Sequence, residues 1–192
     1  MDDTARVLAG SVVGDRLTIG RNSTIGECSI IGNFMTVGCG SVIGANATVG
    51  NKVKIGNKVK IGNKVNIGDG VKIGDGVTIG NGVTIGNGVK IGNGVTICDN
   101  TVVGTEVTIG NNAVVGNGIP VGNNAVVGNE VTINNGVIIF VEGVVIGDRA
   151  IIGDRAIVGV AVSAGDIIPD GGLIVPDAIV INARELRTSP AN

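Results

Sequence analysis

The chain has 192 residues, and its 14 basic and 16 acidic side chains give a net charge of −2. Such a balanced charge excludes a bulk electrostatic attraction to nucleic acid. The chain contains 35 glycines, no Trp or Tyr and only two Phe, which excludes an ordinary core built around aromatic side chains. No apolar run approaches the roughly 18 residues of a membrane-spanning helix, because glycine and polar residues interrupt it every few positions.

Residues 1–10 are predicted to form an N-terminal cap. Met1 to Arg6 lack the basic start and the apolar stretch of a secretory signal peptide, so we expect a cytoplasmic protein. The three cysteines (Cys28, Cys39 and Cys98) agree with this location, because they are an odd number without a Cys-x-x-Cys pair. We therefore expect free thiols, with neither a disulfide framework nor a cysteine zinc site.

Residues 11–160 are predicted to form one solenoid of six-residue repeats. An aliphatic residue recurs at every sixth position from Val13 to Ile139, and Ile79 to Thr84 spell a typical unit, Ile-Gly-Asn-Gly-Val-Thr. The Val-Thr-Ile portion alternates apolar and polar residues, which predicts a short strand with two side chains inward and one outward. The Gly-Asn-Gly portion predicts a turn, because Gly and Asn both tolerate left-handed backbone angles.

Such short strands and corners predict a coil rather than a hairpin meander. Each strand would hydrogen-bond to the equivalent strand one circuit later, and a compact aliphatic interior favours three sides, hence about 18 residues per circuit. The predicted fold class is all-β, a single-stranded parallel β-helix of triangular cross-section. Each buried Val or Ile would contribute roughly 1.5–3 kcal/mol to its stability.

The repeat resembles that of the hexapeptide-repeat superfamily, whose pattern is aliphatic-Gly-x-x-small-x. This resemblance implies a left-handed β-helix, and the superfamily includes acyltransferases and gamma-class carbonic anhydrases. The end segments are similar to the carbonic anhydrase-like branch: Ser11 to Gly20 resemble its opening coil, and Gly165 to Val175 resemble the segment that ends its solenoid. Residues 161–192 are accordingly predicted to be a terminal coil and a C-terminal tail.

The register breaks once, between Ile139 and Ile146, where the spacing is seven residues instead of six. Phe140 stands there at a position that glycine normally occupies. We expect a one-residue bulge at this corner, and a contact between Phe140 and a ligand is the alternative interpretation.

Every third repeat falls on the same predicted face, so the outward residues sort into three columns. One column places Lys54, Lys72 and Lys90 on successive circuits, about 4.8 Å apart. Repulsion between like charges on such a face would keep a flat sheet from pairing with its neighbours. The alternative is a site for an anion or a lipid headgroup, with Asp69, Asp75 and Asp99 on nearby turns.

A second column is the most apolar of the three and is the predicted subunit interface, through Val12, Ile30, Val102 and Ile138. Relatives commonly assemble as trimers with parallel axes, so the resemblance implies a homotrimer. End-to-end stacking of coils into filaments is the alternative assembly. Neither a nucleic-acid partner nor a membrane span is expected.

The chain contains no histidine, which decides the functional prediction. The resemblance implies histidine ligands for the metal of gamma-class carbonic anhydrases and a histidine general base in the acyltransferases. We therefore expect no catalytic residues, no metal and no cofactor, and the leading hypothesis is a non-catalytic structural or assembly protein on a carbonic anhydrase-like scaffold. The near-verbatim repeats of residues 50–97 also fit a regularised or engineered solenoid. A degenerate acyltransferase or carbonic anhydrase-like enzyme that uses carboxylates is the alternative, and anion or surface binding through the lysines is the third hypothesis.

Overall fold

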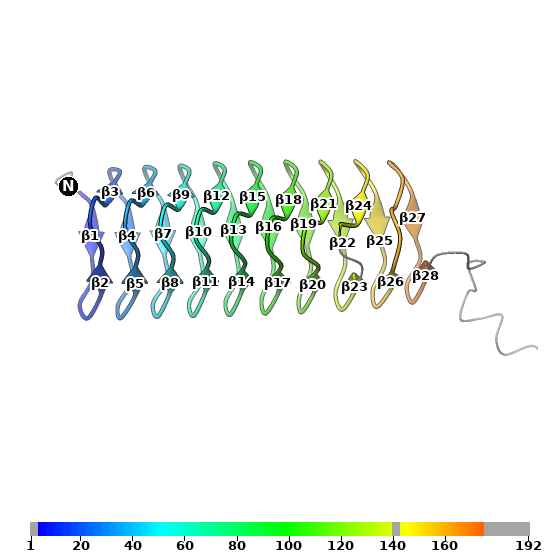
Figure 1. Cartoon of the computed structure of the whole chain (residues 1–192), viewed down its shortest axis with the longest axis horizontal. Helices are drawn as coiled ribbons and strands as arrows, with labels where there is room; N and C mark the ends of the chain where they lie inside the picture. Colours follow the sequence, from blue (N-terminus) through cyan, green and yellow to red (C-terminus); the bar gives the residue numbers. More distant parts are fainter. Residues whose placement is uncertain (1–3, 140–142, 175–192) are drawn as a thin grey trace, which may run out of the picture.

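A computed structural model describes residues 4–139 and 143–174, and in these ranges the chain is all-β. Short parallel strands stack along the long axis of the molecule, and the chain turns a corner after each strand (Figure 1). Three parallel sheets form the sides of a triangular β-helix. The predicted fold class is confirmed.

Each sheet gathers every third strand, so neighbours within a sheet are one circuit apart in the chain. Sheet A consists of β1 (Arg6–Val7), β4 (Thr24–Ile25), β7 (Val42–Ile43), β10 (Lys60–Ile61), β13 (Thr78–Ile79), β16 (Thr96–Ile97), β19 (Val114–Val115), β22 (Thr132–Ile133), β25 (Ile151–Ile152) and β27 (Ile167–Ile168). Sheet B consists of β2 (Val12–Val13), β5 (Ile30–Ile31), β8 (Thr48–Val49), β11 (Asn66–Ile67), β14 (Thr84–Ile85), β17 (Val102–Val103), β20 (Pro120–Val121), β23 (Ile138–Ile139), β26 (Ile157–Val158) and β28 (Leu173–Ile174). Sheet C consists of β3 (Thr18–Ile19), β6 (Thr36–Val37), β9 (Lys54–Ile55), β12 (Lys72–Ile73), β15 (Lys90–Ile91), β18 (Thr108–Ile109), β21 (Val126–Val127) and β24 (Val145–Ile146).

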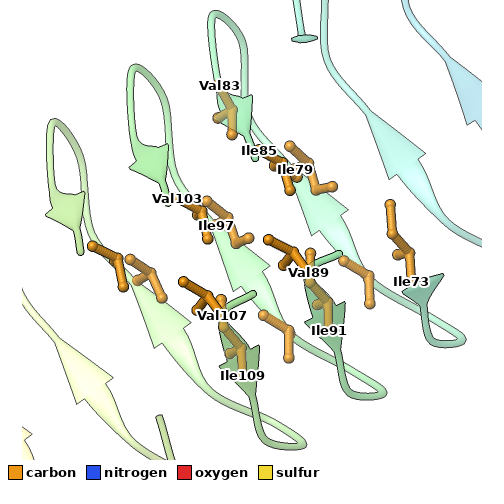
Figure 2. Close-up of a cluster of buried hydrophobic side chains, with 14 of the residues drawn as sticks. Ile73, Ile79, Val83, Ile85, Val89, Ile91, Ile97, Val103, Val107 and Ile109 are labelled. Carbon is orange, nitrogen blue, oxygen red and sulfur yellow. The ribbon is translucent and has the colours of Figure 1, made fainter. Parts of the chain in front are cut away.

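The repeat Val53-Lys54-Ile55 illustrates how the sequence builds a side of the helix. Val53 and Ile55 are buried, whereas Lys54 between them is exposed. The Lys54 N–H donates to the Val71 carbonyl at 2.9 Å, so backbone hydrogen bonds connect each circuit to the next. Figure 2 shows the result in the middle of the solenoid, where Val and Ile from all three sheets fill the interior. The predicted aliphatic core is therefore present.

Three residues form each corner, and glycine serves two different purposes there. Gly56 is a first corner residue, and a Cβ built on it would lie 2.7 Å from the carbonyl carbon of Gly74 in the next circuit. Gly76 is a third corner residue with a φ of +68°, in open space. The left-handed residue of the corner is therefore the third one, and Lys58 (φ 55°) and Phe34 (φ 59°) also adopt this conformation.

The second corner residue forms a ladder of polar bonds along each edge of the prism, which we call the corner ladder. Its side-chain oxygen accepts a hydrogen bond from the backbone N–H of the equivalent residue one circuit earlier. Cys39 N–H donates in this way to Asn57 Oδ1 at 2.8 Å, and Asp75 N–H donates to Asn93 Oδ1 at 2.8 Å. Asn and Asp thus satisfy corner N–H groups that the strand ladder does not reach.

Most circuits have the same length, but two differ. Partners in the corner ladder, such as Cys39 and Asn57, are usually 18 positions apart in the sequence. The separation is 19 positions between Asn129 and Asp148, and it is 16 positions between Asp154 and Asp170. The strands follow the same steps, since Val126 pairs with Val145 and Ile151 pairs with Ile167.

Some of the expected features lie outside the described residues. They include the predicted bulge at Phe140, although the longer circuit agrees with one extra residue between β23 and β24. The predicted tail from residue 175 onward also lies outside them. At the other end, β1 already pairs with β4 at Arg6, so the solenoid includes part of the segment that was predicted to be a cap.

Candidate functional site

Lys54, Lys72 and Lys90 form a column of charged side chains, which we call the lysine column. The three residues lie at the outward positions of β9, β12 and β15 in sheet C. Lys72 is in register with Lys54 on one side and with Lys90 on the other. All three side chains are exposed. The predicted stacking is therefore confirmed, and the three lysines lie on successive strands about 4.8 Å apart.

The corners on either side of sheet C add further charges. Lys52 and Lys58 are the third residues of the corners before and after β9, and both have left-handed backbones. Asp69 and Asp75 are the second residues of the corners before and after β12. The strand that carries Lys72 is thus bounded by a carboxylate at each end.

Each of these carboxylates has one oxygen in the corner ladder. Asp75 Oδ1 accepts hydrogen bonds from the backbone N–H of Asn57 at 2.6 Å and from Asn57 Nδ2 at 3.3 Å. Asp69 Oδ1 accepts the equivalent bonds from Asn51. The second oxygen of each carboxylate makes no hydrogen bond with any described residue. Asp75 therefore has a fixed orientation and an oxygen that remains available as a proton acceptor.

The lysines of the column are not neutralised by ion pairs within the described residues. The single ion pair there joins Arg149 to Glu130 at 4.0 Å, far along the chain from β9, β12 and β15. Exposed ammonium groups that form no ion pair attract anions, although salt screens this attraction.

The cysteines do not form a site. Cys28 and Cys39 are exposed, Cys98 is partly buried, and all three are free. Burial raises the pKa of the Cys98 thiol, and the neighbouring Asp99 carboxylate raises it further. No group of three potential metal ligands comes together in residues 4–139 and 143–174.

The apolar column predicted as an interface is divided in the structure. Val12 and Ile30 form one exposed pair at the start of sheet B, with 64% and 55% of their surfaces exposed. Val102 and Ile138 are also exposed, but Thr48, Asn66 and Thr84 separate them from the first pair on the same face. A second apolar pair, Ile151 and Ile167 at the end of sheet A, did not emerge from the sequence analysis.

Phe34 is another surface feature that the sequence analysis missed. Its side chain is 49% exposed, and the guanidinium of Arg16 lies over its ring at 5.1 Å from the centroid. Both residues are third corner residues on the edge between sheets B and C. A shallow groove of about 320 Å³ adjoins Phe34 and is also lined by Asn33, Asn51, Lys52 and Asp69. Alignment of the third corner positions would have identified Phe34 as the one aromatic residue among them in the described ranges.

Within residues 4–139 and 143–174, no helix has the length and apolar character that crossing a membrane requires. This agrees with the expectation of no membrane span.

Two family models match the repeats. The model of the bacterial transferase hexapeptide (six repeats) matches residues 52–87. The model of the hexapeptide repeat of succinyl-transferase matches residues 100–140 and 143–166. No curated protein matches the sequence significantly.

Solved structures with a similar fold include UDP-N-acetylglucosamine acyltransferases. The enzyme from Moraxella catarrhalis (LpxA) is 19% identical with a TM-score of 0.57, over 97% of this chain and 74% of that one. The Francisella novicida enzyme is 21% identical with a TM-score of 0.51, over 94% and 72% of the two chains. The Arabidopsis enzyme is 16% identical with a TM-score of 0.55, over 95% and 73%. Similarity at this level of identity establishes the shared fold.

These matches contradict the leading functional hypothesis from the sequence. A non-catalytic structural or assembly protein was expected because histidine is absent, but both family models describe transferase repeats and the similar solved structures are acyltransferases. The matches favour the alternative hypothesis, an acyltransferase relative. The hypothesis was wrong because it treated one missing side chain as decisive for the whole class. The similarity of the end segments to carbonic anhydrase-like proteins is not supported by these matches and stays a prediction.

Proposed function

Because the chain belongs to the hexapeptide-repeat superfamily of left-handed β-helices, we propose that it is an acyltransferase relative that binds a phosphate-bearing substrate on the lysine column. The observation that carries this proposal is the in-register stack of Lys54, Lys72 and Lys90 on one exposed sheet. Three ammonium groups at regular spacing are suited to several negative charges on one ligand.

A diphosphate is the ligand that fits this spacing best. Neighbouring strands place successive lysines about 4.8 Å apart, so two adjacent ammonium groups can each contact one phosphate of a diphosphate. The acyltransferases of similar fold are named for UDP-N-acetylglucosamine, a diphosphate-linked sugar. We therefore propose a nucleotide-linked sugar as the class of acyl acceptor.

Acyl transfer also requires a group that takes a proton from the acceptor. The acceptor hydroxyl or amine forms a bond to the acyl carbon, the bond from this carbon to the donor's leaving group breaks, and the proton of the nucleophile passes to a base. The chain offers no histidine for this role. We assign it to Asp75, whose Oδ1 is held by Asn57 while its other oxygen remains available at the edge of sheet C.

Binding is tested by titrating UDP or inorganic pyrophosphate into the protein at low salt in a calorimeter. Exchange of Lys54, Lys72 and Lys90 for Gln is expected to weaken binding at least about tenfold, which corresponds to the loss of one charge-assisted hydrogen bond. The matched control exchanges Lys60 and Lys64, which lie on sheet A and on the corner between sheets A and B. Equal binding by the triple variant and the wild type would exclude the lysine column as the site.

Catalysis is tested separately, by measuring acyl transfer from acyl-thioester donors to a UDP-linked amino or hydroxy sugar. The turnover number of the Asp75→Asn variant is expected to be about 10²-fold lower than that of the wild type, while UDP affinity is retained. Asp99→Asn is the matched control, because Asp99 belongs to the corner between sheets A and B. If the wild-type protein does not transfer an acyl group above background, the enzymatic proposal is wrong even if UDP binds.

We further propose that the chain forms homotrimers in the cytoplasm. The superfamily resemblance implies the trimer, and the exposed pair Val12 and Ile30 supports an apolar contact at one end of sheet B. The free thiols support a reducing compartment.

A further inference from the structure

The Asn-Gly pairs at the corners are potential sites of spontaneous covalent modification. In such a pair the backbone nitrogen of Gly loses its proton and attacks the side-chain carbonyl carbon of Asn. A carbon–nitrogen bond forms, ammonia leaves, and water then opens the resulting succinimide to aspartate or isoaspartate. The chain has Asn-Gly pairs at Asn81, Asn87, Asn93, Asn117 and Asn135.

The corner ladder opposes this reaction in most of these pairs. Before the carbonyl carbon of Asn can reach the Gly nitrogen, the Asn side chain must rotate and release any hydrogen bond that its Oδ1 accepts. Asn81, Asn87 and Asn93 each accept the backbone N–H of the preceding circuit at 2.8 Å. Asn135 accepts both the N–H and the Nδ2 of Asn117 at 2.9 Å.

The attacking nitrogens are also held by the fold. The N–H groups of Gly88 and Gly94 donate to carbonyls of the preceding circuit at 2.9 Å, and that of Gly82 does so at 3.0 Å. The corresponding bonds of Gly118 and Gly136 are longer, at 3.1 and 3.2 Å. Hydrogen bonding of the amide opposes its deprotonation, and all five Gly nitrogens have this protection, so the difference between the pairs lies in the Asn side chain.

Asn117 is the one Asn of the five whose Oδ1 has no ladder bond within the described residues. In the regular ladder this oxygen would accept the N–H of Asp99, but no such hydrogen bond is formed. Asn117 retains one side-chain contact, the donation from its Nδ2 to Asn135 Oδ1 at 2.9 Å. This contact between two exposed side chains is the one hydrogen bond of the Asn117 amide within the described residues, and no backbone N–H of the preceding circuit holds its oxygen. Asn117 is also exposed to water.

Cys98 explains the missing bond. It is the first corner residue one circuit before Asn117, at a position that is glycine in most circuits. The circuits that have glycine at this position show why. A Cβ built on Gly74 would lie 2.4 Å from Asn93 Oδ1, and a Cβ built on Gly92 would lie 2.6 Å from Asn111 Oδ1. The Cβ of Cys98 therefore occupies the space that Asn117 Oδ1 would need.

A Cβ at this position does not remove the bond in every circuit. At Asn134 the neighbouring Asn135 N–H still donates to Asp154 Oδ1 at 3.0 Å. The following circuit is one residue longer there, because Thr132 pairs with Ile151. The circuit of regular length that follows Cys98 provides no such accommodation.

We propose that Asn117–Gly118 is the site at which the folded protein deamidates first. Its side-chain oxygen accepts no ladder bond, whereas in each of the other four pairs a backbone N–H of the preceding circuit holds the Asn oxygen. The expected rate at Asn117 is about three- to tenfold higher than at Asn81, because a contact between two exposed side chains holds the Asn amide less firmly than a hydrogen bond from the backbone.

The test incubates the folded protein at mildly alkaline pH and follows the deamidation of each Asn by peptide mass spectrometry. Asn81, Asn87, Asn93 and Asn117 share the local sequence Gly-Asn-Gly, so incubation in denaturant is expected to give them equal rates. The proposal would be overturned if Asn117 still deamidated first in denaturant. It would also be overturned if Asn117 deamidated no faster than the other Asn residues in the folded protein.

Two variants separate the Cβ from the thiol. Cys98→Gly removes the Cβ and is expected to restore the ladder bond and to slow deamidation of Asn117 to the rate of Asn81. Cys98→Ala keeps the Cβ and is expected to leave the rate unchanged. If Cys98→Gly leaves Asn117 as labile as in the wild type, Cys98 is not the cause of its lability.

Discussion

Glycine illustrates at the residue scale how one residue type meets two different demands in the same corner. Gly56 permits two backbones to approach closely, whereas Gly76 provides a left-handed angle in open space. The two roles differ in energy, because a backbone overlap cannot be relieved by a side-chain rotation. A left-handed L-residue costs only about 1–2 kcal/mol.

Alanine substitutions are expected to separate these two roles. Gly56→Ala should lower the free energy of unfolding by at least about 3 kcal/mol, because the new Cβ collides with Gly74. Gly76→Ala should cost about 1 kcal/mol. Denaturant unfolding followed by far-ultraviolet circular dichroism measures both, and equal losses for the two variants would contradict the distinction.

Ser41 offers a second prediction, because it replaces the usual Val at a buried position. Its Oγ donates to the Gly56 carbonyl at 2.8 Å and accepts the Val59 N–H at 3.1 Å. Val59 and Val77, the equivalent residues in the next circuits, are fully buried. Ser41→Val is therefore expected to raise the free energy of unfolding by about 1 kcal/mol, since the gain in apolar burial exceeds the net value of the hydrogen bonds. Ser41→Ala, which fills less space, should not stabilise the protein, and denaturant unfolding distinguishes the two variants.

Cys98 should react differently from the other two cysteines. Its pKa is raised by burial and by Asp99, so its thiolate forms only at a higher pH than usual. We expect iodoacetamide to modify the exposed Cys28 and Cys39 first at neutral pH, and Cys98 to follow as the pH rises. Because the raised pKa favours the protonated folded state, the contribution of Cys98 to stability is present at neutral pH and is lost in the alkaline range. Peptide mass spectrometry of the alkylated protein reports the order.

At the scale of elements, the stacked strands β9, β12 and β15 place like charges opposite one another, which is unfavourable for the sheet. Lys72 faces a lysine on both sides. We expect Lys72→Gln to stabilise the protein at low salt by a few tenths of a kcal/mol, and added salt to reduce the difference. Thermal unfolding at two ionic strengths measures this effect. A salt-independent difference would mean that the lysines do not repel one another appreciably.

At the scale of the whole molecule, the period of the sequence was sufficient to predict the architecture. Counting every third repeat placed Lys54, Lys72 and Lys90 on one face, and the register confirms this placement. The side-chain alternation of Val53, Lys54 and Ile55 likewise predicted which residues are buried. This success has a physical reason, because a solenoid repeats one local solution and its long-range pairing follows from its period.

The corners beside the lysine column were less predictable, because they depend on departures from the repeat. Lys58 and Phe34 adopt left-handed angles that their residue types disfavour, since the ladders on both sides of the corner impose the backbone. The contact between Arg16 and Phe34 joins two circuits and depends on this angle. The absence of histidine misled the functional hypothesis, because the fold matches transferases in spite of it.

Light scattering of the intact protein tests the proposed assembly. The chain mass is 19.0 kDa, and a trimer would give three times this value at all concentrations. Replacement of both Val12 and Ile30 by Thr is expected to shift the trimer toward monomer, because it removes the exposed apolar pair. Particles that lengthen with concentration would instead indicate end-to-end stacking.

The length of the circuit also determines how this chain tolerates insertions and deletions. A circuit of regular length contains three repeats, one for each sheet, so a change of one repeat turns everything downstream by one side of the prism. If such a change fell between Lys54 and Lys72, the strand of Lys72 would move to a different sheet from that of Lys54. Each repeat would still form its own strand and corner. A change of a whole circuit keeps the faces aligned and only extends the column by one strand spacing, about 4.8 Å. Families of such chains should therefore differ in length by whole circuits wherever a functional face spans the change, and by single repeats elsewhere.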